Sequence, residues 1–195
     1  MADENSTAQP YESQNPPNSQ IPIDLFVSKK YEGIGSRGFL RFTDSADNLV
    51  YTVKKSAHSV KLVVDSSGDT LFSIHRISKG SWQGFRGKDE EKDLIFTVDK
   101  TLDESSRTEF KILFCEKNDD SKTELRMKGC PFNRSCTIYK GNSIVAESSL
   151  MHKLGFEKLF VTRNRFRVTI FPGFADHSLV ASLVVIYFDG RRFWI

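Results

Sequence analysis

Basic side chains recur on alternate residues in two stretches of the chain, and this spacing could create surfaces that bind anions. Arg163, Arg165 and Arg167 stand two residues apart, and Arg126 and Lys128 repeat the spacing. Since successive side chains of a β-strand point to opposite faces, each set would lie on one face of a strand. The planar guanidinium group of Arg suits phosphate, so we expect these residues to contact phosphate or an anionic lipid.

Further basic pairs at 29–30, 54–55 and 191–192 fall near expected strand or domain ends. Basic residues close to an anionic lipid surface gain about 1 kcal/mol each. The alternative for each cluster is an ordinary charged exterior, because strand edges often carry Lys to prevent aggregation.

No motif of catalytic or metal chemistry is complete in the sequence. Residues 33–38 fit the G-x-G-x-x-G pattern, but 39–42 resemble a strand where a dinucleotide site needs a helix. The H-R-D and D-F-G motifs of a kinase do not follow. The histidines and cysteines lack the spacing of zinc ligands, and Cys130 and Cys136 are too far apart in the sequence for that pattern. We therefore expect no enzyme, no catalytic residue, no metal and no cofactor.

The first twenty residues differ in composition from the rest of the chain. Residues 1–20 are rich in Asn, Ser, Gln and Pro and contain no Lys or Arg, which predicts a disordered tail before a single domain at 21–195. Because three of the 25 acidic residues and none of the 28 basic residues lie in this tail, the domain carries +6, against +3 for the whole chain. This excess weakly favours an acidic partner.

The cysteines and the N-terminus bear on the compartment. Three cysteines and no recognisable secretory signal predict reduced thiols and a cytoplasmic protein. Peripheral attachment to the plasma membrane and a nuclear location are the alternatives.

The body of the chain consists of short alternating segments joined by turns rich in Asp, Asn and Gly. Such turn residues accept local hydrogen bonds and tolerate left-handed backbone conformations. The pattern predicts β-strands at 38–42, 49–54, 61–64, 70–75, 93–98, 110–114, 125–128, 136–139, 143–147 and 165–171. About eleven or twelve such strands would suit a closed barrel, which leaves no strand edge exposed.

One late segment is apolar on every side. From Leu179 to Phe188 only Ser182 is polar, and charged residues bracket the run closely. The run is too short for a membrane span, which needs about 20 residues. It must be buried on all sides, and periodicity does not decide between a helix and a strand. A helix here would fill a wide barrel with Leu179, Val180, Leu183, Val184 and Ile186 in its core.

Several segments, taken in order, resemble the plant LURP-one-related family. The resemblance runs from about residue 21 to 190 and rests on 82–87 (Trp-Gln-Gly-Phe-Arg-Gly), 93–98, 128–129, 134–136, 144–146 and 181–186. The family is similar to the tubby C-terminal and phospholipid scramblase superfamily. The resemblance therefore implies a mainly β fold, a closed twelve-stranded tubby-like barrel around a central C-terminal hydrophobic helix.

For function, the resemblance implies a non-enzymatic domain without an established biochemical role, with some relatives linked to plant defence. Tubby-like domains bind phosphoinositides, so the expected partners are an anionic membrane surface or a phosphoinositide, or else a protein. None of the tubby lipid-binding residues is matched. The alternatives are a membrane-tethered regulator of transcription and a scramblase-like lipid protein. We do not expect nucleic acid to be a partner, because no groove-sized basic helix is present.

Overall fold

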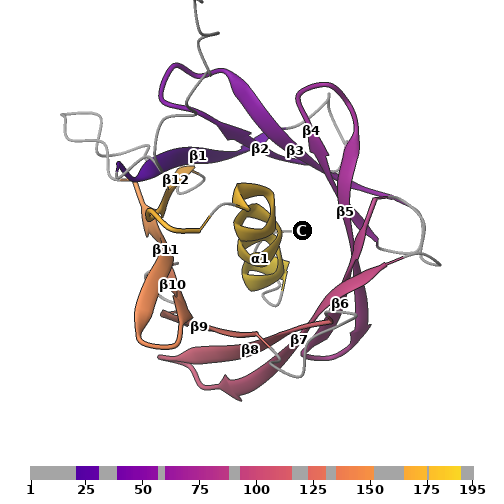
Figure 1. Cartoon of the computed structure of the whole chain (residues 1–195), viewed down its shortest axis with the longest axis vertical. Coiled ribbons are helices and arrows are strands. Elements are labelled where there is room, and N and C mark those ends of the chain that lie inside the picture. The colour runs from indigo at the N-terminus through magenta and orange to yellow at the C-terminus, as the bar shows by residue number, and fades with distance from the viewer. Residues whose placement is uncertain are drawn as a thin grey trace, which may run out of the picture.

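Twelve antiparallel strands close into a barrel around one helix (Figure 1). The computed structural model describes residues 21–30, 39–56, 60–87, 93–115, 123–130, 135–151, 165–174 and 176–189. Each strand pairs with the next along the chain, and β1 pairs with β12 to close the ring. The expected fold class, a closed twelve-stranded barrel with a central C-terminal helix, is therefore confirmed.

The described elements follow one another as a simple meander. They are β1 (Ile23–Lys30), β2 (Phe39–Thr43), β3 (Leu49–Lys55), β4 (Lys61–Asp65), β5 (Thr70–Ser78), β6 (Ser81–Arg86), β7 (Leu94–Asp103), β8 (Thr108–Phe114), β9 (Glu124–Cys130), β10 (Ser135–Lys140), β11 (Ser143–Leu150), β12 (Arg165–Ile170) and α1 (His177–Asp189).

Two of the hairpins show why Asp is placed at the turns. Oδ1 of Asp44 accepts the backbone N–H groups of Ala46 and Asn48, at 2.9 and 2.8 Å. Oδ1 of Asp65 accepts those of Ser67 and Asp69, both at 2.9 Å. These bonds satisfy the turn backbone locally, as the composition of the turns predicts.

The late apolar run forms a helix and not a thirteenth strand. Oδ1 of Asp176 accepts the backbone N–H of Leu179 at 2.9 Å and so caps the first turn. Ser182 is buried, and its hydroxyl donates to the Ser178 carbonyl at 2.9 Å. Since every described strand already has two neighbours in the closed ring, a helix with internally satisfied backbone is the form that fits inside.

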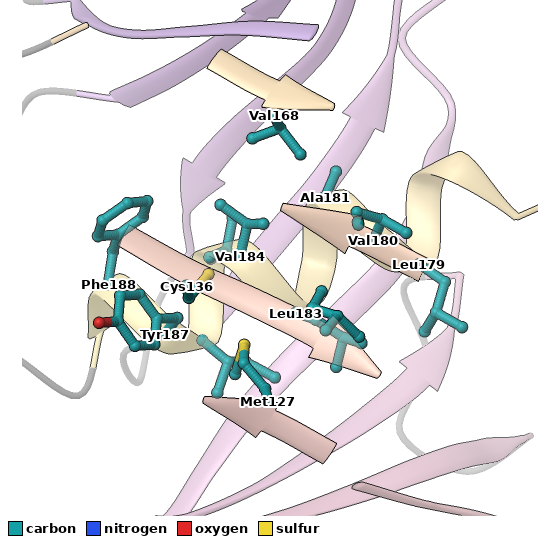
Figure 2. Packing of buried hydrophobic residues seen from close by; sticks show 14 of the residues in the cluster. Met127, Cys136, Val168, Leu179, Val180, Ala181, Leu183, Val184, Tyr187 and Phe188 are labelled. Carbon is teal, nitrogen blue, oxygen red and sulfur yellow. The ribbon is translucent and has the colours of Figure 1, made fainter. Parts of the chain in front are cut away.

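The helix supplies the centre of the hydrophobic core. Figure 2 shows strand residues such as Met127 and Val168 beside the helical side chains. The five residues expected to face the core, Leu179, Val180, Leu183, Val184 and Ile186, lie in α1 and are buried.

Two strands, β1 and β6, are not among those that the sequence pattern predicts. In β1, Leu25 and Val27 point inward, but Phe26 lies on the outer face and obscures the alternation. In β6, the inward positions include Gly84, where an added Cβ would lie 2.2 Å from the Phe96 ring. The predicted tail, residues 1–20, lies outside the described residues.

Candidate anion-binding surface

Because α1 occupies the interior, the places left for a ligand are the outer face of the barrel and its two ends (Figure 1). The predicted basic residues that the structure describes lie on these surfaces.

Arg165 and Arg167 lie on the outer face of β12, with both side chains exposed. Phe166 and Val168 point inward and are buried, as the alternation predicts. Among the described residues, neither arginine forms a salt bridge with an acid. Arg163 lies outside the described residues.

Arg126 and Lys128 lie on the outer face of β9, where acidic neighbours offset part of their charge. Arg126 Nε is 2.9 Å from Oε1 of Glu124, and Lys128 Nζ is 4.0 Å from Oε1 of Glu109. Hydrogen bonds from Arg126 and Lys111 lower the pKa of the Glu124 carboxyl, which keeps this acid charged at neutral pH. Since β10 and β11 separate β9 from β12, the two predicted sets do not form one site.

A wider concentration of positive charge lies at the end of the barrel where α1 finishes, which we call the basic end. Because neighbouring strands run in opposite directions, the last residues of β3 and the first of β4 and β12 meet there. The acidic residues described at or near this end are Asp99, Asp103, Glu104, Glu109, Glu147 and Asp189. Its basic residues are Lys29, Lys30, Lys54, Lys55, Lys61, Arg76, Lys79, Lys100, Arg107, Lys128 and Arg165.

The opposite end, where α1 begins, is acidic. Its described basic residues are Arg86, Arg126 and Lys140. Hydrogen bonds from the side chain and backbone of Asn48 lower the pKa of Asp44, so this carboxyl is charged at neutral pH. The acidic residues of this end are Asp24, Asp44, Asp47, Asp65, Asp69, Asp93, Glu124 and Asp176. The charges are thus segregated along the barrel axis.

Much of the positive charge at the basic end faces solvent. Lys54, Lys55, Lys79 and Arg165 are exposed and form no salt bridge within the described part of the chain. Lys61 is different, because it points into the barrel and pairs with Asp189. The exposed residues are therefore available to an external anion, whereas Lys61 has a partner inside the protein.

Sequence reasoning found Lys29, Lys30, Lys54, Lys55, Lys128 and Arg165 but missed the other basic residues of this end and did not group them. The missing signal was the order of the hairpins. In a meander each strand reverses direction, so alternate turns lie at opposite ends of the barrel. Sorting the charged residues by turn number would have separated the two ends.

Apolar side chains accompany the arginines of β12. Met151 is 38% exposed, and its backbone N–H donates to the Arg165 carbonyl at 3.2 Å. Phe26, which is half-buried, stands directly beside Arg167 on the adjacent strand. This part of the surface combines cationic and apolar groups, a combination that suits the interface of a lipid bilayer.

A groove of about 440 Å³ opens on the outside of the barrel at the basic end. Its polar lining residues include Ser106, Arg107, Lys128, Cys130, Ser135 and Thr137. A smaller hollow of about 240 Å³ lies nearby on β8 and β9 and contains Lys111, Glu124 and Arg126.

The described residues include no candidate metal site and no candidate membrane-spanning helix. Within them, no group of three or more His, Cys, Asp or Glu side chains is arranged to hold a metal ion. In the same part of the chain, no helix has the length and apolar character needed to cross a membrane. The motif at 33–38 lies outside the described residues, and the segment that follows it is the strand β2.

Comparison with known proteins relates nearly the whole chain to one group. The chain is 46% identical to Protein LURP-one-related 7 of Arabidopsis thaliana over 182 residues, which cover 93% of this chain and 97% of the relative. It is 28% identical to Protein LURP-one-related 15 from the same plant, over 88% of this chain and 81% of the relative.

Protein LURP1 of Arabidopsis thaliana is more distant, at 25% identity over 86% of this chain and 84% of the relative. No solved structure matches the chain. The family model described as LURP-one-related matches residues 23–189, which includes every strand of the barrel and the helix within it. The chain therefore belongs to the LURP-one-related family.

Proposed function

We propose that this protein is a non-enzymatic binding domain that attaches to anionic phospholipid surfaces through the basic end of its barrel. The observation that carries the proposal is the segregation of charge between the two ends. With one end basic and the other acidic, a negative surface attracts the first and repels the second, so it selects one orientation of the barrel.

The expected strength of attraction is sufficient for reversible attachment. Lys or Arg near an anionic bilayer contributes about 1 kcal/mol per residue, and the effect falls off within a Debye length of about 10 Å at moderate salt. Lys55, Lys79 and Arg165 lie at the rim, and Arg167 lies two residues farther along β12. Met151 and Phe26 supply apolar contact beside the arginines.

Attachment through the basic end does not require α1 to enter the membrane. The apolar residues of α1 are buried inside the barrel, so they are already removed from water. Attachment through the exterior leaves this core intact and would be peripheral.

Vesicle sedimentation tests the proposal with two variants that remove the same charge. The test variant carries Lys55→Gln, Lys79→Gln, Arg165→Gln and Arg167→Gln. The control carries Lys111→Gln, Lys140→Gln, Arg86→Gln and Arg126→Gln, which also removes two Lys and two Arg but spares this surface. Vesicles of phosphatidylserine and phosphatidylcholine are compared with vesicles of phosphatidylcholine alone.

We expect the unmodified protein to sediment with the phosphatidylserine vesicles and to be released by high salt. The test variant should bind about a hundredfold more weakly, because about 1 kcal/mol is lost for each of its three rim residues, Lys55, Lys79 and Arg165. The control should bind nearly as well as the unmodified protein. Equal sedimentation with both kinds of vesicle, or equal loss in both variants, would overturn the proposal.

The biological setting we infer is defence signalling in plants, following the family resemblance. A plant line that lacks the protein should show altered growth of a pathogen, and the unmodified chain should restore resistance. If the test variant also restores resistance, the role in defence does not depend on membrane attachment.

A further inference from the structure

We infer that the groove at the basic end is a binding site for a phosphate monoester carried on a small hydroxylated group. This site lies within the basic end, but it does not use the four residues changed in the vesicle test variant. It requires no membrane, and a soluble ester can test it even if vesicle binding fails.

The groove is an open, polar depression with the volume of a small-molecule site. Its volume of about 440 Å³ lies within the range of about 300 to 1,000 Å³ that ligand pockets usually occupy. Two cations, Arg107 and Lys128, line it together with the hydroxyl groups of Ser106, Ser135 and Thr137. No acidic residue is among those that line it.

The sheet register fixes the relative positions of these groups. Lys128 lies between Glu109 on β8 and Thr137 on β10, directly beside each. Cys130 pairs with Ser135 one step closer to the barrel rim. Arg107 immediately precedes β8 and therefore enters the groove from the turn. The lining groups thus come from two neighbouring strands and the turn before a third.

One carboxylate, on the side of the neighbouring hollow, pairs with both cations. Arg107 Nη2 forms an ion pair with Oε1 of Glu109, and Lys128 Nζ lies 4.0 Å from the same oxygen. This oxygen is buried from solvent, and Glu109 does not line the groove. Two cations sharing one carboxylate leave about one positive charge directed at the groove.

A phosphate monoester fits this arrangement better than a single carboxylate does. Arg107 uses one terminal nitrogen for Glu109, and its other N–H donors have no partner within the described residues. The guanidinium fork and an ammonium group together suit the several oxygens of phosphate. The three hydroxyl groups suit a polyol next to that phosphate, because a hydroxyl both donates and accepts.

The reactivity of Cys130 can report ligand binding in the groove. Cys130 lines the groove and is partly exposed, whereas Cys115 is exposed beyond the end of β8, at the other end of the barrel. A bound ligand should slow the alkylation of Cys130 by iodoacetamide and leave that of Cys115 unchanged. Peptide mass spectrometry measures the two rates in the same sample.

Two matched variants identify the residues that bind the phosphate ester. Arg107→Gln with Lys128→Gln removes the pair that shares Glu109. Arg126→Gln with Lys111→Gln removes an equivalent pair that shares Glu124 on the same two strands. We titrate glucose 6-phosphate, inorganic phosphate and glucose, and expect protection of Cys130 by glucose 6-phosphate to weaken about tenfold or more in the first variant. The second variant should match the unmodified protein, and glucose alone should not protect.

Vesicles distinguish the two sources of a phosphate monoester. If the natural source is a lipid headgroup, phosphatidylinositol 4-phosphate vesicles should protect Cys130 better than phosphatidylserine vesicles of equal charge. If the source is a free ester, the two vesicles should protect equally and glucose 6-phosphate should protect without them. The inference is overturned if no phosphate ester, soluble or lipid-bound, protects Cys130, or if both variants lose protection equally.

Discussion

Trp82 donates its indole N–H to the carboxylate of Asp189 at 3.0 Å, across the interior of the basic end. The other carboxylate oxygen pairs with Lys61. Asp189 is the last residue of α1, so one side chain ties the helix to both β4 and β6. A negative group at the end of a helix opposes the helix dipole, and Lys61 offsets this cost.

We predict that Asp189→Ala destabilises the protein by about 2–3 kcal/mol. Removal of one partner from a buried ion pair leaves the other charge uncompensated, which costs about 3–5 kcal/mol for full burial. The Lys61 side chain is 15% exposed and can reach some water, so the expected cost is lower. Urea unfolding measures the change in the free energy of unfolding.

Asp103→Ala is the control for this change. Asp103 also pairs with a lysine, Lys100, at 3.0 Å, but its side chain is 58% exposed. An exposed pair contributes about 0–1 kcal/mol, so this variant should be nearly as stable as the unmodified protein. Equal losses from the two substitutions would contradict the role given to Asp189.

A second prediction concerns the protonation of Lys61. Burial lowers the pKa of Lys61 below its ordinary value, and the Asp189 carboxylate opposes this shift. An NMR titration of the Lys61 side chain should therefore show a lowered pKa, and Asp189→Asn should lower the pKa further. A normal pKa in the folded protein, or an upward shift in the variant, would refute this account.

The lowered pKa of Lys61 also sets the sign of its effect on stability. Between the folded-state pKa and the ordinary value of about 10.4, the unfolded chain binds more protons than the folded one. This group therefore makes the free energy of unfolding rise with pH in that alkaline window. Below the folded-state pKa its contribution is independent of pH.

The third prediction concerns the close approach of α1 to β9. A Cβ added at Gly129 would lie 2.2 Å from the hydroxyl oxygen of Tyr187 and 2.4 Å from its ring. Tyr187 is buried and donates its hydroxyl to the Ser135 carbonyl at 3.0 Å, so it cannot move aside easily. Gly129→Ala should therefore cost about 3 kcal/mol, at the upper end for overpacking.

A double-mutant cycle isolates this contact. In a Tyr187→Ala background the space next to Gly129 is empty, so the added methyl group should cost little. Chemical unfolding of the four proteins gives the coupling energy between the two positions. An unchanged cost of Gly129→Ala in that background would show that the strain arises elsewhere.

The strands were predictable where alternation and turn chemistry agreed. Residues 49–54 follow the turn built on Asp44, and residues 61–64 precede the turn built on Asp65. Both strands have inward apolar side chains, so local sequence determined them. In β6, Gly84 and Trp82 are adapted to partners far away in the sequence, Phe96 and Asp189. The local sequence pattern does not show which residues of other elements these side chains will contact.

The candidate surfaces were predictable to different degrees. The exposed arginines of β12 follow from alternation alone. The groove does not, because Arg107 and Lys128 are brought together by the pairing of β8 with β9 and by a shared Glu109. Sequence spacing gives the face of a strand, whereas the pairing register decides which side chains meet across strands.

The last prediction concerns α1 as the filling of the barrel. A fragment of residues 1–175 lacks the whole helix, so inward residues such as Phe110, Met127 and Val168 would surround an empty interior. Loss of this buried apolar surface should unfold the domain, since hydrophobic burial is the main favourable term in folding. Circular dichroism and size-exclusion chromatography of the fragment measure this, with a chain ending at Gly190 as the control that keeps α1. A monomeric 1–175 fragment with native β structure and cooperative unfolding would show that the barrel stands without its helix.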